Sequence, residues 1–498
     1  MFLAHALNPN RKTNINGLNM VSGATQVFAD GAIALSERKT RGIPSSNAVL
    51  AGTSLAGCLA FVGGSVVTVA LSAIGRDLKL SSAELQWLVN AELLPLAALT
   101  LVAGALGDRF GQKRMLITGI VGVGLGLATM SIATGPRALF AARFLQGLGE
   151  AFILPNSLSL LGQAFPAQSK AHAVGVWSAA AAVASAIAPA ATGAILVAGG
   201  WRIPFVLLLP LVAAALFLTV VWIPESTRRA DAPVDIAGAV LSAVGLGSLA
   251  AGLTNLSNSG ELTSFVMACF GASLVTFLAM VVVEHHGGKR AMLPPSLFAS
   301  RSVVGANLFT ALLYGAFSAI FTLLPFVMIR GAELSVLIVG FAFIPVQVVM
   351  TIVSPLAGML CRRFGRRTPL LAGAIVTAFA CLAALRIDER SFYLADIFPA
   401  VFLLAIGMSL AIAPLTTLVL TTVEVDHAGT AAGVNAAVSR AGSLLAVALL
   451  GGVLGGGGSE LIAGFHTAMV WSAVVSVLAA LSVLIVEPGP HVDFIPRD

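Results

Sequence analysis

The sequence has very little charge for its length. Only 10% of its 498 residues are Asp, Glu, Lys or Arg, whereas soluble domains carry about 25%. Apolar residues make up 58% of the chain and recur in runs of about 20, the length an α-helix needs to cross about 30 Å of hydrocarbon. Alternating segments of about ten residues, the pattern of a transmembrane barrel, are missing. The composition excludes an ordinary soluble protein and predicts an all-α, polytopic membrane protein.

Cysteine is scarce, and its spacing matches no known kind of site. The four cysteines lie within apolar runs or at the edge of a basic loop, at positions Cys58, Cys269, Cys361 and Cys381. Such scattering predicts neither a disulfide framework nor a metal site. His285 and His286 are adjacent, which is poor geometry for joint chelation. We expect no metal and no cofactor.

A nucleotide-binding loop is missing as well. The sequence contains no G-x-x-x-x-G-K-[ST] motif, and the glycine run at 455–459 is followed by Glu460 where the motif requires lysine. No polar segment is long enough for a nucleotide-binding domain, and no nucleophile, base and orienting residue form a recognisable set. These absences argue against an ATP-driven pump and against an enzyme. They leave a protein driven by an ion gradient or by none.

Apolar runs between charged or Gly/Pro-rich breaks predict fourteen transmembrane helices. The first seven are expected at about 49–74, 86–107, 115–134, 138–162, 172–197, 203–223 and 236–256. The other seven are expected at about 264–283, 303–328, 335–360, 368–386, 395–422, 430–454 and 466–486. An even number of spans places both termini on one side of the membrane.

The distribution of Lys and Arg indicates which side that is. Of the 28 basic residues, 19 fall on the side of the termini, 7 on the opposite side, and Arg143 and Arg440 within spans. Because short cytoplasmic loops carry the excess of positive charge, both termini are expected in the cytoplasm. These loops and the anionic headgroups that they face account for the net charge of +6, so no nucleic-acid partner is implied.

One basic loop occurs twice. GALGDRFGQKR at 104–114 and GMLCRRFGRR at 358–367 share Gly, Leu, Arg, Phe, Gly and Arg, and 254 residues separate the copies. Eight predicted spans fall within this period. Equal halves of six helices therefore leave two extra helices between them, which predicts a 6+2+6 arrangement.

This arrangement divides the chain. Six-helix bundles are expected at 49–223 and 303–486, with two inserted helices at 236–283. Residues 1–48 are polar and lack the apolar core of a signal peptide, so we expect a disordered cytoplasmic tail there. Residues 487–498 are expected to form a second cytoplasmic tail.

Several stretches, in the order in which they occur along the chain, are similar to the motifs of a known family. GALGDRFGQKR is similar to the loop signature G-x-L-a-D-r-x-G-r-r, and LFAARFLQGLGEA at 139–151 to a motif with a membrane arginine, here Arg143. Further similar stretches are QWLVNAELL at 86, LPNSLSLL at 154, GWR at 200 and GVNAAVSRAGSLLAVA at 433. Over about residues 50–486 the chain resembles the major facilitator superfamily, and within it the fourteen-span drug:proton antiporter branch of multidrug efflux transporters.

The resemblance implies a conformational latch in the first copy of the loop. The positions that match its signature are Gly104, Asp108, Arg109, Gly111 and Arg114. In this superfamily the matching aspartate interacts with a neighbouring helix end and with basic side chains, and helps to hold one alternating-access state. A tight turn and the topology already explain the glycines and the basic residues, so Asp108 is the informative one. The second copy has Arg362 in its place, so only the first half is expected to carry the latch.

Proton coupling needs a titratable group that is shielded from water. Besides Arg440, the spans contain Glu92, Arg143 and Glu150. In the predicted topology Glu92 and Arg143 lie about 10 and 8 Å from the outer side, at 1.5 Å per residue. We expect these two to face each other and to couple to protons. Glu150, two turns below Arg143, is expected to be the deeper carboxylate in the proton path. The alternatives are that Glu92 snorkels to the outer interface and that Glu150 makes a static helix–helix hydrogen bond.

Two stretches depart from the branch that the chain resembles. Many relatives carry an aspartate in the first span within L-D-x-T-I-V-N-V-A-L-P, whereas VGGSVVTVALS places Gly63 at that position. Either Glu92 and Glu150 supply the missing charge, or the protein couples differently or not at all, and a strongly cationic substrate is not favoured. SAIAPAATGAIL at 185–196 is a worn form of the antiporter signature G-P-x-x-G-G. Its remaining Pro189 and Gly193 predict a helix kink with close packing.

Together these features predict a secondary transporter that exports amphipathic organic compounds by alternating access, driven by inward proton flow. We expect it in the plasma membrane, here a bacterial inner membrane, with a small-molecule substrate, protons, the lipid bilayer and a candidate periplasmic adaptor as partners. Trp177 and Tyr314 are candidate ring contacts for substrate, although packing is the more ordinary role of each. Uptake or facilitated diffusion of a specific metabolite is one alternative. A transport-inactive scaffold or sensor is another, against which the retained Asp108 and Arg143 argue.

Overall fold

The computed structural model describes residues 46–225, 234–287, 300–422, 428–454, 456 and 458–486. The chain separates into a unit of residues 1–47 and a unit of residues 48–498, and only the second is described below. Two expected tails lie outside the described residues: the tail at 487–498 entirely, and the tail at 1–48 as far as residue 45.

Most described residues are helical, and none of them forms a β-strand. The first eight helices are α2 (Ser46–Asp77), α3 (Ser82–Phe110), α4 (Gln112–Ile132), α5 (Pro136–Ala164), α6 (Ala167–Gly199), α7 (Ile203–Trp222), α8 (Ile236–Ser259) and α9 (Ser264–Gly287). They are followed by α11 (Arg301–Arg330), α12 (Val336–Ala342), α13 (Ile344–Phe364), α14 (Arg367–Ala383), α15 (Phe398–Thr421), α16 (Ala428–Ala448), α17 (Gly451–Leu454) and α18 (Gly458–Ser482). Short helical turns are η2 (Ala384–Arg386), η3 (Tyr393–Ile397) and η5 (Val483–Ile485).

Each predicted span coincides with one of these helices or with consecutive ones. The tenth span is divided, because α12 ends and α13 begins around Phe343, and Pro345 lies at the start of α13 where its missing N–H is tolerated. The largest difference is the last span, which was predicted from 466 but begins at Gly458. Glu460 in its first turn interrupts the apolar pattern, yet a carboxylate is favourable at a helix N-terminus.

Thirteen helical segments of the described chain are long and apolar enough to cross a membrane. α5 is not among them. It contains Arg143 and Glu150, which lower its hydropathy, yet it packs closely against α3 and α4. The all-helical membrane architecture is therefore confirmed, whereas the total of fourteen spans stays a prediction.

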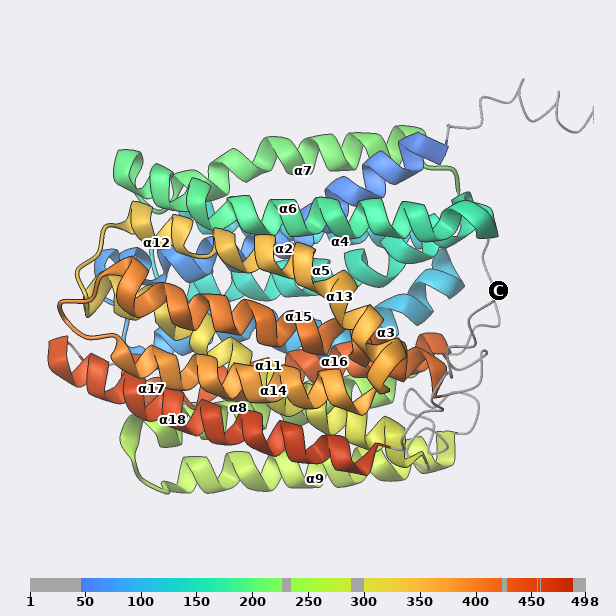
Figure 1. Cartoon of the computed structure of the whole chain (residues 1–498). Coiled ribbons are helices and arrows are strands. Elements are labelled where there is room, and N and C mark those ends of the chain that lie inside the picture. The colour runs from blue at the N-terminus through green and yellow to red at the C-terminus, as the bar shows by residue number, and fades with distance from the viewer. Residues whose placement is uncertain are drawn as a thin grey trace, which may run out of the picture. The chain divides into compact units, whose positions relative to one another are not determined.

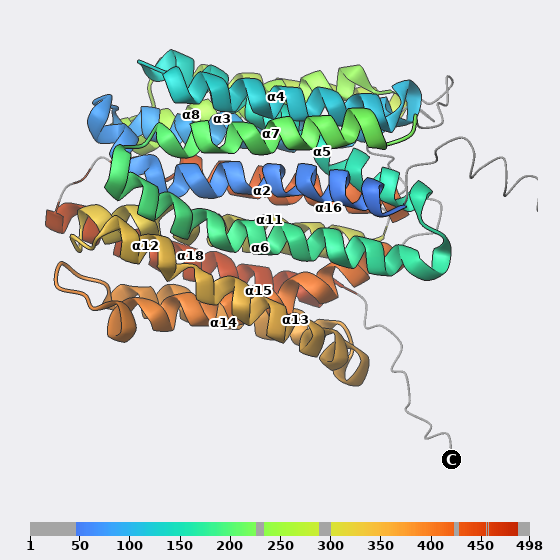
Figure 2. The same cartoon turned by 90° about the horizontal axis from the view of Figure 1, so that it is seen from above.

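The helices lie side by side (Figures 1 and 2). α3 to α7 pack on one another, as do α11 to α18, and α16 contacts α3 while α12 and α13 contact α6. α8 contacts α3, α16 and α17, and α9 packs on α8. The start of α2 and the end of α18 lie at one end of the bundle in Figure 1. We call the opposite end, where α3 begins and α8 and α16 finish, the far end.

The repeated loop forms the same turn twice. Gly111 separates α3 from α4 with a φ of 105°, and Gly365 separates α13 from α14 with a φ of 77°. Residues with a side chain rarely adopt such positive φ values. The repeat therefore keeps a glycine where the backbone of each half requires one.

Candidate functional site

Glu92 and Arg143 meet inside the bundle. Glu92 on α3 and Arg143 on α5 are 5% and 1% exposed, and Nη2 of Arg143 forms an ion pair with Oε2 of Glu92. Arg143 also donates from Nε to the carbonyl oxygen of Leu88 and from Nη1 to Oε1 of Gln146, both at 3.0 Å. Opposite charges that are buried together offset part of their desolvation cost. Glu92 thus has a buried partner, which does not fit a side chain that snorkels to the interface.

Glycine allows α3 and α5 to approach closely enough for this pair. A Cβ atom at Gly147, one turn after Arg143, would overlap the carbonyl oxygen of Glu92 and lie 2.9 Å from its Cα. Small residues at helix crossings in membranes permit such backbone contact. The site therefore depends on a residue without a side chain as well as on the charged ones.

Gly63, at the position of the aspartate that many relatives carry in the first span, lies beside the two glutamates. A Cβ atom at Gly63 of α2 would be 3.2 Å from Oε1 of Glu150, 3.3 Å from Nε2 of Gln146 and 3.9 Å from Oε1 of Glu92. At the next residue, Gly64, it would be 3.6 and 3.7 Å from the two carboxylate oxygens of Glu92. Two carboxylates from α3 and α5 therefore converge on the position where many relatives carry an aspartate.

Glu150 is the carboxylate with spare hydrogen-bonding capacity. It is 1% exposed, and its Oε1 has no hydrogen-bond partner in the described part of the chain. The cations that act on its charge are Arg143 and, from α16, Arg440. Arg440 lies seven residues after Gly433, whose Cβ would meet Leu101 of α3, so it occupies the face of α16 that is turned toward α3. Glu150 thus interacts electrostatically with a helix of the other half.

Sequence reasoning missed Gln146. Its Oε1 accepts from Arg143, while its Nε2 is buried without a partner among the described residues and lies next to Gly63. The available signal was position, because Gln146 lies between Arg143 and Glu150 on the same face of α5. We call Glu92, Arg143, Gln146 and Glu150 the charged cluster.

The predicted latch lies in the turn between α3 and α4. Asp108 is exposed and accepts a hydrogen bond of 2.8 Å from Nε2 of Gln112, the first residue of α4. The carboxylate is therefore at the N-terminus of α4, where its charge is favourable. Arg109 is also exposed, and its guanidinium carbon lies 5.6 Å from the ring centre of Phe110.

The other latch residues contact the same half of the protein. Gly104 faces Pro155 of α5, and its Cβ would lie 3.6 Å from that of the proline. Arg114 lies with Nε 3.9 Å from Oε2 of Glu225, just after α7. Lys113 donates to the carbonyl oxygen of Val220 in α7 at 2.9 Å. The structure thus joins this loop to the end of the sixth predicted span, and its conformational role stays a prediction.

Pro189 and Gly193 face the second half of the protein. A Cβ at Gly193 would lie 2.6 Å from the carbonyl oxygen of Val336, and a Cβ at Gly340 would lie 2.6 Å from that of Pro189. α6 runs as one helix through Pro189. The arrangement shows close packing between α6 and α12 near the far end, as small residues allow.

The two aromatic candidates differ in their surroundings. Trp177 of α6 is 7% exposed and donates from Nε1 to the carbonyl oxygen of Thr53 in α2 at 3.1 Å, with Phe61 in edge contact. These contacts pack α6 on α2. Tyr314 of α11 is only partly buried, and the charge of Arg440 acts on its hydroxyl. Contact with substrate stays a prediction for both.

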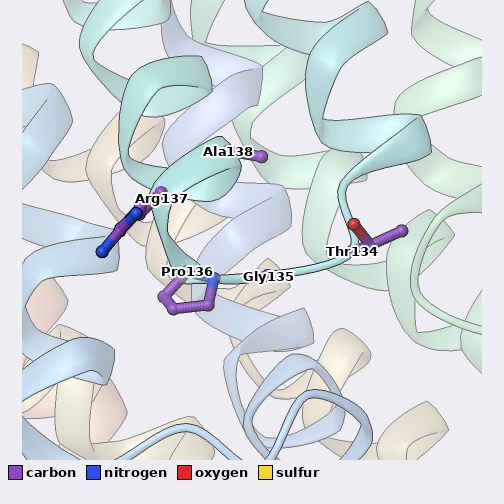
Figure 3. Close-up of a pocket in the computed structure, with 5 residues that line it drawn as sticks. All are labelled: Thr134, Gly135, Pro136, Arg137 and Ala138. Carbon is purple, nitrogen blue, oxygen red and sulfur yellow. The ribbon is translucent and has the colours of Figure 1, made fainter.

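A surface pocket of about 300 Å³ lies at the turn between α4 and α5 (Figure 3). Its lining residues are Thr134, Gly135, Pro136, Arg137 and Ala138, none of which is a predicted site residue. Within the described ranges, no group of three or more His, Cys, Asp or Glu side chains could hold a metal ion. The candidate site is therefore the charged cluster around Gly63.

Comparison with a family model decides the family. The model of the Major Facilitator Superfamily matches residues 53–447, which include the charged cluster and both copies of the loop. The chain belongs to the Major Facilitator Superfamily. It is therefore a multi-pass membrane protein of a transporter family, and the resemblance found in the sequence is confirmed.

Curated relatives of this superfamily member are resistance and export proteins. Multidrug resistance protein Stp of Mycobacterium tuberculosis is 30% identical over 81% of this chain and 75% of its own length. A probable actinorhodin transporter of Streptomyces coelicolor is 32% identical over 78% of this chain and 69% of its own. Cephamycin export protein CmcT of Amycolatopsis lactamdurans is 30% identical over 82% of this chain and 86% of its own length.

Solved structures confirm the major facilitator fold. An auto-inhibited peptide transporter of the POT family superposes with a TM-score of 0.65 over 91% of this chain and 98% of its own, at 17% identity. A bacterial homolog of the human lysosomal transporter Spinster, in an inward-facing and occupied conformation, superposes with a TM-score of 0.61. The match covers 88% of this chain and 96% of that chain, at 18% identity. At such identities the likeness concerns the fold alone.

Proposed function

We propose that this protein exports amphipathic organic compounds across the plasma membrane by alternating access, in exchange for protons that flow inward. Relatives that are at least 30% identical and bear the names of multidrug resistance and export proteins support export. The sequence has no phosphate-binding loop, so an ion gradient is the available source of energy. The positions of Lys and Arg support cytoplasmic termini, and the repeated loop supports a 6+2+6 arrangement.

The charged cluster carries the proposal. Ionisable groups inside a membrane bundle are costly and mark ion or proton pathways. Glu92 is neutralised by Arg143, whereas Oε1 of Glu150 has no hydrogen-bond partner among the described residues and lies beside Gly63. We infer that Glu150 receives the proton and that Glu92 and Arg143 hold the Glu150 side chain in place. The two glutamates would thus supply the membrane carboxylate that the absent aspartate would otherwise provide.

Exchange requires that proton and substrate oppose each other's binding. An ionised Glu150 attracts Arg440 of α16, and a protonated one does not, so the proton changes an attraction between the two halves. Substrate that enters between the halves from the cytoplasm would favour the ionised form and release the proton inward. Tyr314, beside Arg440, is the aromatic contact that this scheme favours.

Proton movement in proteoliposomes that contain a pH-sensitive dye tests the proposal. Lipophilic drugs and dyes are screened on wild type, Glu92→Gln, Glu150→Gln and the control Glu261→Gln, an exposed carboxylate outside the bundle. We expect Glu150→Gln to abolish substrate-induced proton flux, since the amide cannot take up the proton. Glu92→Gln should reduce it at least tenfold, because removing one partner of a buried pair strands the charge of Arg143. The control should match wild type.

The other outcomes select the alternatives. Equal flux in wild type and both cluster variants would assign the glutamates a static role. Transport of a compound without proton movement would favour facilitated diffusion or uptake of a specific metabolite. If no compound moves in any variant, the protein is better described as a membrane scaffold or sensor. A requirement for a periplasmic adaptor would appear as export that occurs in cells and not in proteoliposomes.

A further inference from the structure

Three helix ends from different parts of the chain meet at the far end of the bundle. α3 begins there, the inserted helix α8 finishes there, and α16 of the second half finishes there (Figure 1). Gln86, in the second turn of α3, is fully buried although its side chain is polar. It therefore needs hydrogen-bond partners from the neighbouring helices.

Those partners come from both neighbours. Nε2 of Gln86 donates to the carbonyl oxygens of Val447 and Ala448, the last residues of α16, at 3.0 and 2.9 Å. Nδ2 of Asn258 donates to Oε1 of Gln86 at 2.6 Å, and Oγ of Ser257 donates to the Ala448 carbonyl at 3.0 Å. The last carbonyls of a helix lack partners within it, so these side chains cap α16. We call Gln86, Ser257 and Asn258 the cap cluster.

Close packing and apolar contacts surround the cap cluster. A Cβ at Gly451, just after α16, would lie 2.6 Å from Oγ of Ser257 and overlap the amide of Asn258. One layer inward, Ala250 of α8 and Leu444 of α16 pack with Leu94 of α3. Water is thereby kept from Gln86, and breaking its bonds without replacement would leave buried polar groups unpaired, which costs several kcal/mol in a membrane.

The same interface contains unused hydrogen-bonding groups one turn further in. Asn90 follows Gln86 by four residues and is fully buried, and neither polar atom of its side chain has a partner in the described chain. Oγ1 of Thr254, four residues before Asn258, is likewise buried without a partner there. Residues four apart share a helix face, so both point into the interface of α3, α8 and α16. An interface with spare donors and acceptors can exchange partners when its helices shift.

We propose that the cap cluster is the far-end gate of the transport cycle, and that the inserted helix α8 is a working part of this gate. Alternating access requires α3 and α16 to separate at this end, which breaks the bonds from Gln86 to Val447 and Ala448. Ser257 and Asn258 set the stability of the closed state, and Asn90 and Thr254 take up partners in the open one. α8 therefore positions the gate instead of only filling space between the halves.

Distance measurements between spin labels test the gate. Labels are placed at Arg137 and Glu389, exposed residues at the far end of the first and second halves, in protein whose four native cysteines are replaced by serine. Asn258→Leu and Gln86→Leu are compared with wild type in lipid nanodiscs. Thr129→Val is the matched control, since among the described residues its hydroxyl bonds within its own helix, to the Leu125 carbonyl. Each lost hydrogen bond should raise the population that shows the long distance, relative to the population that shows the short one, about fivefold to tenfold.

Each outcome decides the matter. A shift in both gate variants but not in the control supports the proposal. A shift with Gln86→Leu alone overturns the role of α8, and unchanged distances in both would make the cap cluster a static brace. If Gln86→Leu does not fold, Asn258→Leu and Ser257→Ala still test α8, because both side chains lie nearer the surface. The inference rests on alternating access but not on protons or export, and this measurement uses neither gradient nor substrate.

Discussion

At the scale of single residues, the absence of a side chain at Gly63 shapes the charged cluster. Glu150, Gln146 and Glu92 all approach the space that a side chain would occupy there. With the pair of Glu92 and Arg143 neutral, the remaining charges in this region are those of Glu150 and Arg440. The cluster therefore carries one negative charge fewer than the same arrangement with an aspartate in the first span.

Gly63→Asp should change which compounds are exported. A third carboxylate beside Glu150 favours positive charge nearby, so export of cationic dyes should rise severalfold relative to neutral ones. Gly63→Asn is the matched control because it adds the same volume without the charge. The measurement is the ratio of initial export rates for a cationic and a neutral dye in cells. Equal ratios in the Asp and Asn variants would show that charge at this position does not select substrate.

At the scale of helices, the two inserted elements differ in their surroundings. α9 exposes most of its apolar side chains, among them Leu274, Leu278 and Val282, as a helix that faces lipid does. α8 instead buries small and polar residues between its neighbours: Gly245 and Gly252 face α9, and Ala250 packs against α3 and α16. The difference is what one expects if α8 takes part in the gate and α9 separates it from the lipid.

Helix contact in the first half depends on glycine. Gly147→Ala should lower the thermal unfolding midpoint by several degrees, because its Cβ would overlap the carbonyl of Glu92 and overpacking costs about 1 to 3 kcal/mol. It should also reduce proton flux by displacing Glu92 from Arg143. Gly271→Ala in α9 is the control and should be neutral or slightly stabilising, because the added Cβ has no described neighbour within 4 Å beyond the local helix backbone. Comparable midpoints for the two variants in detergent would contradict this account.

At the scale of the whole molecule, the repeated loop braces each half in the same way. Lys113 donates to the carbonyl of Val220 near the end of α7, and Arg367, 254 residues later, donates to the carbonyl of Val486 after η5 at 2.6 Å. Each basic side chain thus binds the end of the sixth predicted span of its own half. Cations at helix C-termini also interact favourably with the helix dipole.

Arg367→Gln should destabilise the second half. Loss of a charged donor to a helix-end carbonyl costs about 1.5 to 3 kcal/mol, less the part that water at the surface replaces. The adjacent Arg366→Gln is the control, because no hydrogen bond or ion pair of Arg366 occurs among the described residues. Thermal unfolding of the two variants in detergent provides the comparison. The brace would be refuted by an Arg367→Gln midpoint that matches that of the control.

Local sequence determined much of this protein. Long apolar runs had to become helices, since only a helix satisfies its own backbone hydrogen bonds in lipid. The loop repeat indicates the positions of the two glycine turns, and the constant rise of a helix predicts that Glu92 and Arg143 lie at similar depth. The superfamily could be predicted from the sequence because its motifs are short and contiguous.

Contacts between distant helices were decided only by the tertiary structure. Gln86 looked like one polar residue in an apolar run, and its partners lie 361, 362 and 172 residues away. The convergence of Glu92 and Glu150 on Gly63 likewise needs α2, α3 and α5 packed together. Hydropathy and helical periodicity report the environment of one segment at a time, whereas the pairing of buried polar groups depends on how non-adjacent helices are oriented around each other. The sequence alone therefore determined the helices and the family, and packing decided which buried polar groups meet.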